Sequence, residues 1–359
     1  MAFSYKRIVV KIGSNVLTQN DGLPDIARIK NITAQIAAVR QKGIELILVS
    51  SGAVASGRSV ISVSDRTDAI AARQLLAAVG QVKLINTYST LFEEHDMLCA
   101  QVLVTKEDFR DRKHYLNMKN CFQILLQNKV VPIVNENDVV SVTELMFTDN
   151  DELAGLVAAM LNADALIILS NVDGIYNGDP KQEGAKVIEE IPARETNFAS
   201  FISTGKSEFG RGGMLTKSVM AQKVARLGIS VHVANGKKDN VLPELLGNNL
   251  VHTRFTPDKT ASGTKKWLAT SATAATGIVQ VNEGAKSALV SGKAASLLPV
   301  GMVAVLSDFQ KGDIIRVVDE QEELIGLGIA QYGADKARER IGQRNQKALV
   351  HYDYFYPAI

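Results

Sequence analysis

The sequence predicts a three-layer α/β sandwich with a mostly parallel central sheet, followed by a small, mostly β domain. From residue 5 to about residue 235, short apolar runs rich in β-branched residues alternate with longer helical patterns. The runs are apolar at nearly every position, which is typical of parallel strands covered by helices on both faces. From residue 277 onward, short strand-like segments recur between turns, and this pattern indicates a separate β module.

The elements follow in chain order. The expected strands of the first part are RIVVKI, ELILVS, LCAQVLVT, VVPIVN, ALIILS and SVHVAN. The expected helices are 25–42, 67–92, 115–127, 151–161 and 217–227. Residues 247–276 predict a closing strand and then a linker. In the last part the strand-like segments are GIVQV, SALV, VAVLS, IIRVVD, LIGLGIAQY and KALVHYDYF. We therefore expect one domain over 1–260, a linker over 261–276 and a second domain over 277–359.

The composition excludes several classes of protein. Hydrophobic residues make up 46% of the chain, charged residues 22%, and the net charge is +2, which predicts a soluble globular protein without wholesale nucleic-acid binding. The two cysteines have no CxxC partner or nearby histidine cluster, so neither a structural disulfide nor a zinc site is expected. The N-terminal apolar run is too short for a signal peptide, and no stretch reaches the roughly 18 apolar residues of a membrane span. We expect a cytoplasmic protein.

Polar motifs follow the first two expected strands. Ligands of parallel α/β sheets bind beyond the carboxyl ends of the strands, where this sequence places Lys11 and Gly13 in KIGS and Ser51, Gly52 and Ala53 in SSGA. Glycine lets backbone N–H groups approach a phosphate, and lysine adds charge. Either turn alone is equally consistent with tight packing between a strand and a helix. Two such turns on adjacent strands favour an anion site.

A glycine-rich loop, FGRGG, delivers Lys217 to the first turn of an expected helix. Lysine is unfavourable at the positive end of a helix unless an anion lies between them. The nearby TGKS resembles the end of a P-loop, but that motif requires glycine at position 200, which is Ser200. We therefore reject a P-loop and interpret Lys217 as an anion ligand.

The stretch TDNDELAG carries Asp149, Asn150 and Asp151, and a segment expected to form a β-hairpin separates it from NENDVV. Capping of the following helix explains one of these side chains, but not three. If Lys11 and Lys217 converge on one pocket, a carboxylate is needed to hold the two like charges together. Asp151 is the candidate.

Taken together, these motifs contain two lysines, glycine-rich turns, hydroxyl groups and acidic side chains. They contain neither a histidine nor a cysteine nucleophile. Phosphoryl transfer to a carboxylate fits this inventory, because the attacking oxygen is already anionic and needs no general base. Catalysis then depends on positioning and on charge neutralisation by lysines, N–H groups and Mg²⁺.

Six motifs in order resemble the amino-acid kinase family over about residues 5–260. They are VVKIGSNVLT, LVSSGAVASG, VPIVNENDVV, TDNDELAGLVA, SNVDGIYNGDP and GRGGMLTKSVMAQ. The resemblance implies an αβα amino-acid-kinase sandwich that uses ATP and L-glutamate to form ADP and L-glutamyl 5-phosphate, the first step of proline biosynthesis. It also implies feedback inhibition by proline and a homo-oligomer.

The resemblance also assigns roles to residues. The implied catalytic residues are Lys11, Lys217 and Asp151. The implied substrate-binding residues are Ser51, Asp138 and Asn150. Backbone donors to the phosphates or the reacting carboxylate would be Gly13, Gly52 and Ala53. Asp138 would pair with the α-ammonium of glutamate, as its charge allows, and this favours a substrate with a free ammonium over N-acetylglutamate or carbamate.

The nucleotide side would be formed by residues at the ends of two expected strands and by the loop 211–217. They are Lys11, Gly13, Ser170, Asn171, Arg211, Gly212, Gly213, Met214, Leu215, Thr216 and Lys217. Two of them depart from the family pattern, because Asn171 replaces a usual acid and Arg211 a usual small hydroxyl residue. Mg²⁺ is expected to enter with ATP rather than on protein ligands.

The C-terminal segment that begins TGIVQVNEGAK resembles a PUA domain, a small fold known in RNA-modifying proteins. Its run KARERIGQRNQK concentrates five basic residues against one acid, which favours a solvated helix face over an RNA contact. A competing interpretation makes the whole chain an inactive ligand-sensing or RNA-associated protein. The intact set of Lys11, Lys217 and Asp151 favours the enzyme.

Overall fold

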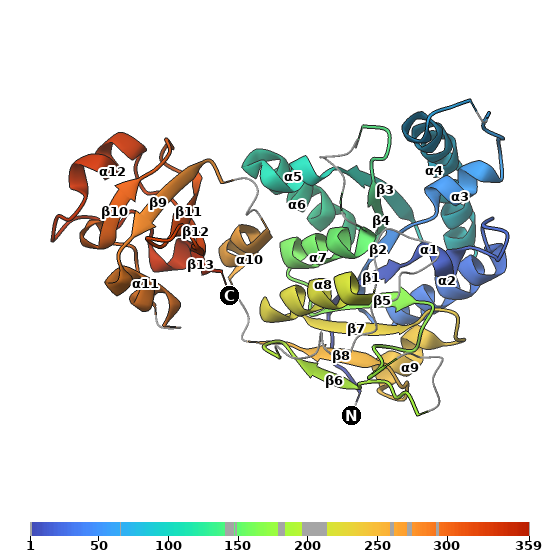
Figure 1. Ribbon diagram of the computed structural model, residues 1–359. Coiled ribbons are helices and arrows are strands. Elements are labelled where there is room, and N and C mark those ends of the chain that lie inside the picture. Colours follow the sequence, from blue (N-terminus) through green and yellow to red (C-terminus); the bar gives the residue numbers. More distant parts are fainter. Residues whose placement is uncertain are drawn as a thin grey trace. The chain divides into compact units, whose positions relative to one another are not determined.

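The computed structural model describes residues 2–64, 66–140, 147, 149–178, 184–195, 214–258, 262–270, 275–291 and 294–358. The chain divides into two compact units (Figure 1). The first comprises Met1–Asp108 with Lys113–Thr260, and the second comprises Phe109–Arg112 with Ala261–Ile359.

The first unit is built on an eight-stranded sheet with the order β3-β4-β2-β1-β5-β7-β8-β6. The strands are β1 (Arg7–Ile12), β2 (Glu45–Ser50), β3 (Cys99–Val104), β4 (Val131–Glu136), β5 (Ala165–Ser170), β6 (Glu190–Pro192), β7 (Ser230–Asn235) and β8 (Thr253–Thr256). Neighbouring strands are parallel except β7 and β8, which run antiparallel. The six strands predicted in the first part are confirmed, and β8 is the expected closing strand.

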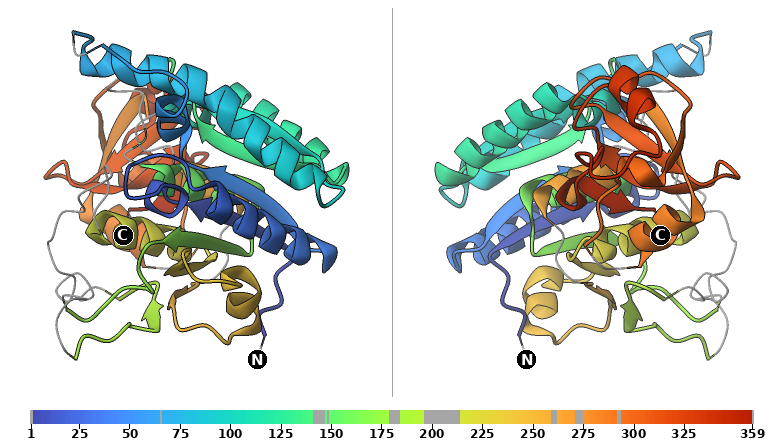
Figure 2. Two further views of the ribbon diagram at one scale, coloured as in Figure 1. Left: turned by 90° about the vertical axis from the view of Figure 1, so that its right-hand side faces the viewer. Right: turned by 90° about the vertical axis from the view of Figure 1, so that its left-hand side faces the viewer.

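Helices cover both faces of this sheet (Figure 2). They are α1 (Ser14–Leu17), α2 (Ile26–Gln41), α3 (Ala53–Arg58), α4 (Ala69–Glu93), α5 (Lys106–Arg110), α6 (Arg112–Gln127), α7 (Asn150–Leu161), α8 (Met214–Arg226) and α9 (Val241–Gly247). One core lies between β1 and the helices α2, α4 and α9, and it takes Ile8, Val10 and Ile12 from the strand. Side chains alternate along a strand, so Lys11 points to the opposite face, where α7 packs on β1. The predicted three-layer α/β architecture is confirmed.

Helices α3 and α4 cross at two glycines. A Cβ atom at Gly80 would lie 1.8 Å from the carbonyl oxygen of Ala53, and one at Gly57 would lie 2.0 Å from that of Leu76. Both obstacles are backbone atoms, so no rotamer change relieves the clash. The close crossing sets where α4 lies beside the strand ends.

We expect Gly80→Ala to lower the free energy of unfolding by about 3 kcal/mol, because the two helix backbones must separate to admit a methyl group. Gly178→Ala is the matched control, since a Cβ atom there meets nothing within 4 Å and the expected change is below about 0.5 kcal/mol. Urea unfolding measures both changes. Equal stability of the two variants would contradict the close crossing.

Two buried histidines connect the N-terminal segment to β7 and the segment before β8. His252 Nδ1 lies 2.7 Å from the carbonyl oxygen of Leu250 and therefore donates to it. His252 Nε2 then accepts from His232 Nδ1 at 2.8 Å, and His232 Nε2 accepts from the Tyr5 hydroxyl at 2.9 Å. This order of donors and acceptors requires both rings to be neutral.

Stability of the first unit is therefore expected to depend on pH. Burial, with the neighbouring His252 and Arg254, holds the pKa of His232 well below its ordinary value, and burial also lowers the pKa of His252. A histidine with a lower pKa in the folded state is destabilising only below the unfolded pKa of about 6.5, where the unfolded chain binds more protons.

We expect the free energy of unfolding in urea to fall as the pH drops from 7.5 to 5.5, by at most about 1.4 kcal/mol per pH unit for each histidine. His232→Gln is expected to flatten this slope, whereas His95→Gln, outside the pair, retains it. A slope unchanged by His232→Gln would show that other groups cause the acid sensitivity.

The second unit holds a five-stranded sheet with the order β10-β9-β11-β12-β13. Its strands are β9 (Gly277–Val281), β10 (Met302–Val305), β11 (Ile314–Val318), β12 (Leu324–Ile329) and β13 (Phe355–Pro357). Its helices are α10 (Gly263–Thr270), α11 (Glu283–Val290) and α12 (Ala334–Arg340), with short turns η4 (Pro299–Gly301) and η5 (Tyr352–Tyr354). The mostly β character predicted for this part is confirmed, and α12 includes the start of the basic run.

Three expectations for this unit are corrected. SALV was expected as a strand but lies in α11, because Asn282 caps a helix by accepting from Ala285 N at 2.9 Å. KALVHYDYF is not one strand: Val350 makes an isolated bridge to Leu297, and only Phe355 belongs to β13. The stretch 261–276, expected as a linker, contains α10, which groups with the second unit.

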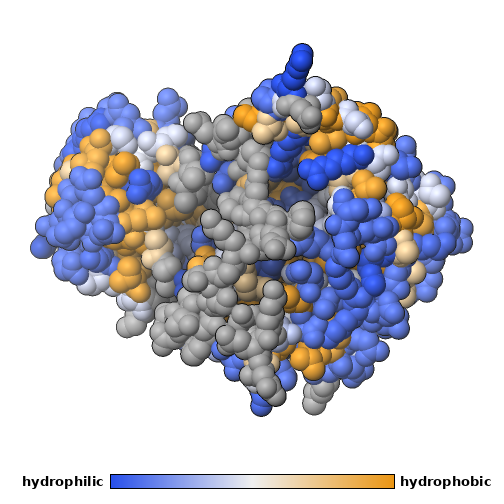
Figure 3. Space-filling model, turned by 45° about the vertical axis from the view of Figure 1, so that its right-hand side comes forward, coloured by the Kyte–Doolittle hydropathy of each residue, from blue (hydrophilic) through white to orange (hydrophobic). Residues whose placement is uncertain are grey.

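The exposed surface carries apolar side chains in small groups among hydrophilic ones, as one face shows in Figure 3. Val82 and Leu98 are among the most exposed large apolar residues. Within the described ranges, no helix combines the length and the apolar character needed to cross a bilayer.

Candidate active site

Three charged side chains from three elements meet on the α7 face of the sheet. Lys11 Nζ of β1 lies 2.7 Å from Asp151 Oδ1 of α7, and Lys217 Nζ of α8 donates to Asp151 Oδ2. The carboxylate is buried, with 3% of its side chain exposed. The structure thus brings together the two lysines and the acid that the sequence motifs singled out.

Local structure explains this convergence. Asp149 caps α7, because its Oδ1 accepts from Asp151 N at 2.9 Å and from Glu152 N at 3.1 Å. One turn after Asp151, Gly155 lets α7 and α8 approach closely: a Cβ atom there would lie 2.8 Å from Val224 Cγ2. The close contact holds Lys217, in the first turn of α8, against the start of α7.

The electrostatics of the cluster favour an anion. Burial alone would raise the pKa of Asp151, but the ammonium groups of Lys11 and Lys217 outweigh it and hold the pKa well below its ordinary value. Burial lowers the pKa of Lys11, opposed by Asp151 and reinforced by Lys217. Burial and the nearby Asp151 carboxylate raise the pKa of Asp149. Taken alone, the two lysines and the Asp151 carboxylate carry one excess positive charge, and a phosphate beside the ammonium groups would neutralise it.

A chain of amide and hydroxyl groups continues from the cluster. Asn150 Nδ2 donates to Ser51 Oγ at 2.9 Å and to Asn135 Oδ1 at 3.1 Å. Asn135 Nδ2 in turn donates to Gln81 Oε1 of α4 at 3.0 Å. Ser51 and Asn150 were predicted as site residues, whereas Gln81 was missed. Its signal was a single amide in the apolar stretch LLAAVGQV.

Asp138 is also buried, and its partner was not foreseen. Arg73 of α4 donates through Nε to Asp138 Oδ1 at 3.0 Å and also through Nη2. The same Nη2 lies 3.7 Å from Glu136 Oε2. The available signal was an arginine in the otherwise uncharged helix stretch AIAARQLLAAVGQ.

The three backbone N–H donors expected in the glycine turns have different surroundings in the structure. The N–H of Gly13 donates to the carbonyl of Leu169 at 3.1 Å. Gly52 has φ +108°, a conformation that favours glycine. Ala53 begins α3, and the first N–H groups of a helix have no partner within it.

The residues expected on the nucleotide side are partly described. Ser170 ends β5, and its Oγ lies 3.5 Å from Asn171 Oδ1. Met214, Leu215 and Thr216 form the first turn of α8 ahead of Lys217. Arg211, Gly212 and Gly213 lie outside the described residues, as does the hairpin expected between NENDVV and TDNDELAG, apart from Phe147.

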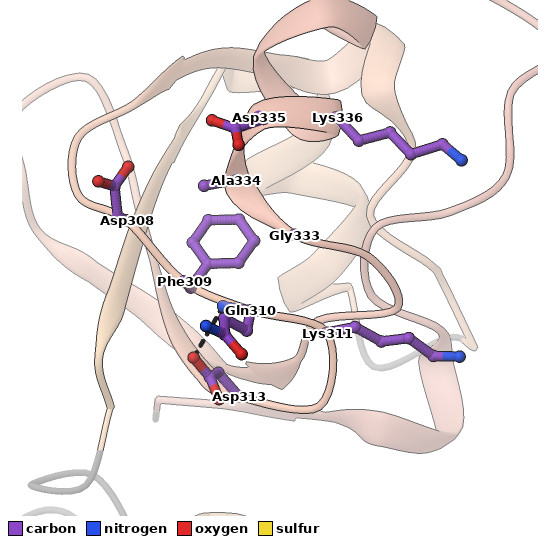
Figure 4. A pocket seen from close by; sticks show the side chains of 9 residues that line it. All are labelled: Asp308, Phe309, Gln310, Lys311, Asp313, Gly333, Ala334, Asp335 and Lys336. Carbon is purple, nitrogen blue, oxygen red and sulfur yellow. Dashed lines mark hydrogen bonds between the residues drawn. The ribbon is translucent and has the colours of Figure 1, made fainter.

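A hollow of about 690 Å³ lies elsewhere, in the second unit (Figure 4). Three carboxylates line it, and Asp313 accepts from Gln310 N at 2.8 Å. None of the residues that line this hollow was predicted as an active-site residue. Over the described parts of the chain, no group of three or more His, Cys, Asp or Glu side chains is arranged to hold a metal ion.

The comparisons with known proteins agree with the fold of the two units. Residues 6–235 match the model of the amino acid kinase family and residues 277–351 match that of the PUA domain. A solved carbamate kinase from Giardia lamblia, bound to AMP-PNP, shares the fold with a TM-score of 0.52 at 19% identity, over 70% of this chain and 99% of that one. The chain belongs to the amino acid kinase family.

Two relatives narrow the assignment. The glutamate 5-kinase of Chlorobaculum tepidum is 52% identical over 98% of this chain and 97% of its own length. That of Bacteroides thetaiotaomicron is 51% identical over 99% of both chains. Within the family, the chain is therefore placed among the glutamate 5-kinases.

Proposed function

We propose that the chain transfers the γ-phosphoryl group of ATP to the γ-carboxylate of L-glutamate, giving ADP and L-glutamyl 5-phosphate. The observation that carries the proposal is the buried cluster of Lys11, Asp151 and Lys217 at the strand ends. The glutamate 5-kinase relatives support the substrate and the reaction.

In the proposed step, a γ-carboxylate oxygen forms a bond to the γ-phosphorus while the bond to the bridging oxygen of ADP breaks. The attacking oxygen carries its own negative charge, so no side chain has to remove a proton. The lysines Lys11 and Lys217 balance the charge on the transferring group. Asp151 acts through them, because it fixes both ammonium groups in place.

The remaining site residues receive proposed binding roles. Ser51 and Asn150 contact the glutamate chain, and Asp138 pairs with its α-ammonium. The N–H groups of Gly52 and Ala53 serve the reacting carboxylate or the phosphates. The proposed nucleotide side is formed by Lys11, Gly13, Ser170, Asn171, Met214, Leu215, Thr216 and Lys217, with Arg211, Gly212 and Gly213 from the undescribed loop.

Further features of the proposal come from family membership. We propose that Mg²⁺ enters with the triphosphate of ATP, where it would neutralise charge; the roles of the side chains do not depend on it. We also propose a cytoplasmic homo-oligomer that serves the first step of proline biosynthesis and is inhibited by proline. The domain boundaries proposed for function are a kinase domain over 1–260 and a PUA domain from 277.

The test is ATP-dependent acyl phosphate formation, trapped with hydroxylamine as the hydroxamate. We expect turnover with L-glutamate, and little with N-acetylglutamate, aspartate or carbamate run in parallel. ADP release without any hydroxamate would overturn the acyl phosphate product. No turnover with any acceptor, in a folded chain that binds ATP, would favour the alternative of an inactive sensing or RNA-associated protein.

A further inference from the structure

The ion pair between Arg73 and Asp138 involves one of the two carboxylate oxygens and two of the three guanidinium nitrogens. Both contacts from the guanidinium, through Nε and Nη2, go to Asp138 Oδ1. Among the residues that the structure describes, neither Arg73 Nη1 nor Asp138 Oδ2 has a hydrogen-bond or ion-pair partner. A donor with full positive charge and an acceptor with full negative charge therefore remain side by side.

Neighbouring groups hold this ion pair in place but leave part of the Arg73 side chain exposed to solvent. Asp138 is buried and follows β4, while 32% of the Arg73 side chain is exposed. Glu136, whose side chain is 7% exposed, lies 3.7 Å from Arg73 Nη2 and accepts from Phe147 N at 2.9 Å. The guanidinium is thus held between two buried carboxylates with one edge toward solvent.

The pair also belongs to the same wall as the amide chain of the site. Helix α4 supplies Arg73 and, about two turns later, Gln81, which accepts from Asn135. Asn135 contacts Asn150 and stands three residues before Asp138. The same helix and the same strand end therefore place Arg73 next to the residues proposed to hold glutamate.

An α-amino acid presents a carboxylate and an ammonium on one carbon atom. The two free edges of the Arg73 and Asp138 pair carry the opposite charges on neighbouring side chains, and a guanidinium recognises a carboxylate through paired N–H groups. Lys11 and Lys217 are bound to Asp151 and, in the proposed function, serve the phosphoryl group. Among the described residues, Arg73 is the cation paired with Asp138 and can bind a second carboxylate.

We propose that Arg73 binds the α-carboxylate of the substrate and so determines specificity for an α-amino acid. The inference rests on the proposed function and adds a residue to it. Asp138 orients the guanidinium through Oδ1 and offers Oδ2 to the α-ammonium of the same substrate molecule.

The test compares L-glutamate with 4-aminobutyrate, which keeps the ammonium and the γ-carboxylate but lacks the α-carboxylate. We expect Arg73→Gln to raise KM for L-glutamate by about 10- to 100-fold, the loss of a hydrogen bond to a charged group, with a smaller change in kcat. The affinity for 4-aminobutyrate, measured as a substrate or as a competitive inhibitor, is expected to stay within about twofold of the wild type. Arg73→Lys is expected to recover part of the affinity for glutamate.

The control is Lys83→Gln, which removes an exposed positive charge from the same helix and is expected to leave both affinities unchanged. Equal loss of affinity for the two compounds in Arg73→Gln would show that Arg73 only supports the structure, and would overturn the inference. A wild-type chain that binds ATP but never phosphorylates L-glutamate would instead overturn the proposed function.

Discussion

Replacement of Lys217 by alanine is expected to lower kcat for glutamate-dependent ADP formation by about 10²- to 10³-fold, the effect of removing one preorganised charge donor from a transition state. The ammonium group of Lys217 is held by the buried Asp151 carboxylate, and 12% of the Lys217 side chain is exposed. Because the charge on the phosphoryl group grows only during transfer, KM for L-glutamate should change far less. Steady-state kinetics separate the two parameters.

Lys223→Ala is the matched control, since Lys223 is an exposed lysine on the same helix. We expect it to keep the wild-type kcat. A Lys217→Ala variant that retains its fold and most of its kcat would show that Lys217 does not face the transferring phosphate.

Asp151→Asn is expected to remove both activity and stability. The substitution leaves the ammonium groups of Lys11 and Lys217 facing each other without the buried carboxylate between them. Breaking a buried ion pair in this way costs about 3 to 5 kcal/mol, and misplaced lysines should lower kcat by at least about 10²-fold. Urea unfolding and steady-state kinetics measure the two effects.

Glu152→Gln tests whether any carboxylate in this turn has the same effect. Glu152 pairs with Lys106 at 3.1 Å, but 18% of its side chain is exposed, so the expected change in stability is about 1 kcal/mol or less. Similar losses in Asp151→Asn and Glu152→Gln would contradict the special place of Asp151 between the lysines.

The layers of the first unit could be predicted because parallel strands and amphipathic helices have different apolar periods. After Arg7, the strand RIVVKI is apolar on both faces except at Lys11, and Lys11 is the residue at the site. The short helix α3 was missed, because its sequence AVASGR carries no helical period. Its position comes from the close crossing with α4 at Gly57 and Gly80, a tertiary contact that the sequence alone does not reveal.

In the second unit, SALV shows the limit of short apolar runs. Four residues cannot distinguish a strand from a helix turn, and the decisive signal was the cap at Asn282, which precedes the run by five residues. KALVHYDYF failed for a related reason. Its residues favour a strand by type, but the backbone turns at η5 after Val350.

At the site, residues near the carboxyl end of a strand or at the start of a helix could be singled out, because strand ends of a parallel sheet meet at one edge. Lys11 lies near the end of β1, and Asn150 and Asp151 lie in the first turn of α7. Arg73 and Gln81 were missed because they lie within a long helix, where spacing does not identify which polar side chain turns inward. The bond from the Gly13 N–H to Leu169 was not predictable, since it depends on the register of β1 and β5.

The central claim is that the γ-carboxylate of glutamate attacks the γ-phosphorus of ATP. The most direct measurement uses L-glutamate labelled with ¹⁸O in that carboxylate, followed by hydroxylamine, which attacks the carbonyl carbon and expels phosphate. We predict that the released phosphate carries one ¹⁸O atom from glutamate, detected by its mass. Released phosphate without the label would show that no carboxylate oxygen joined the phosphorus, and would contradict the proposed reaction.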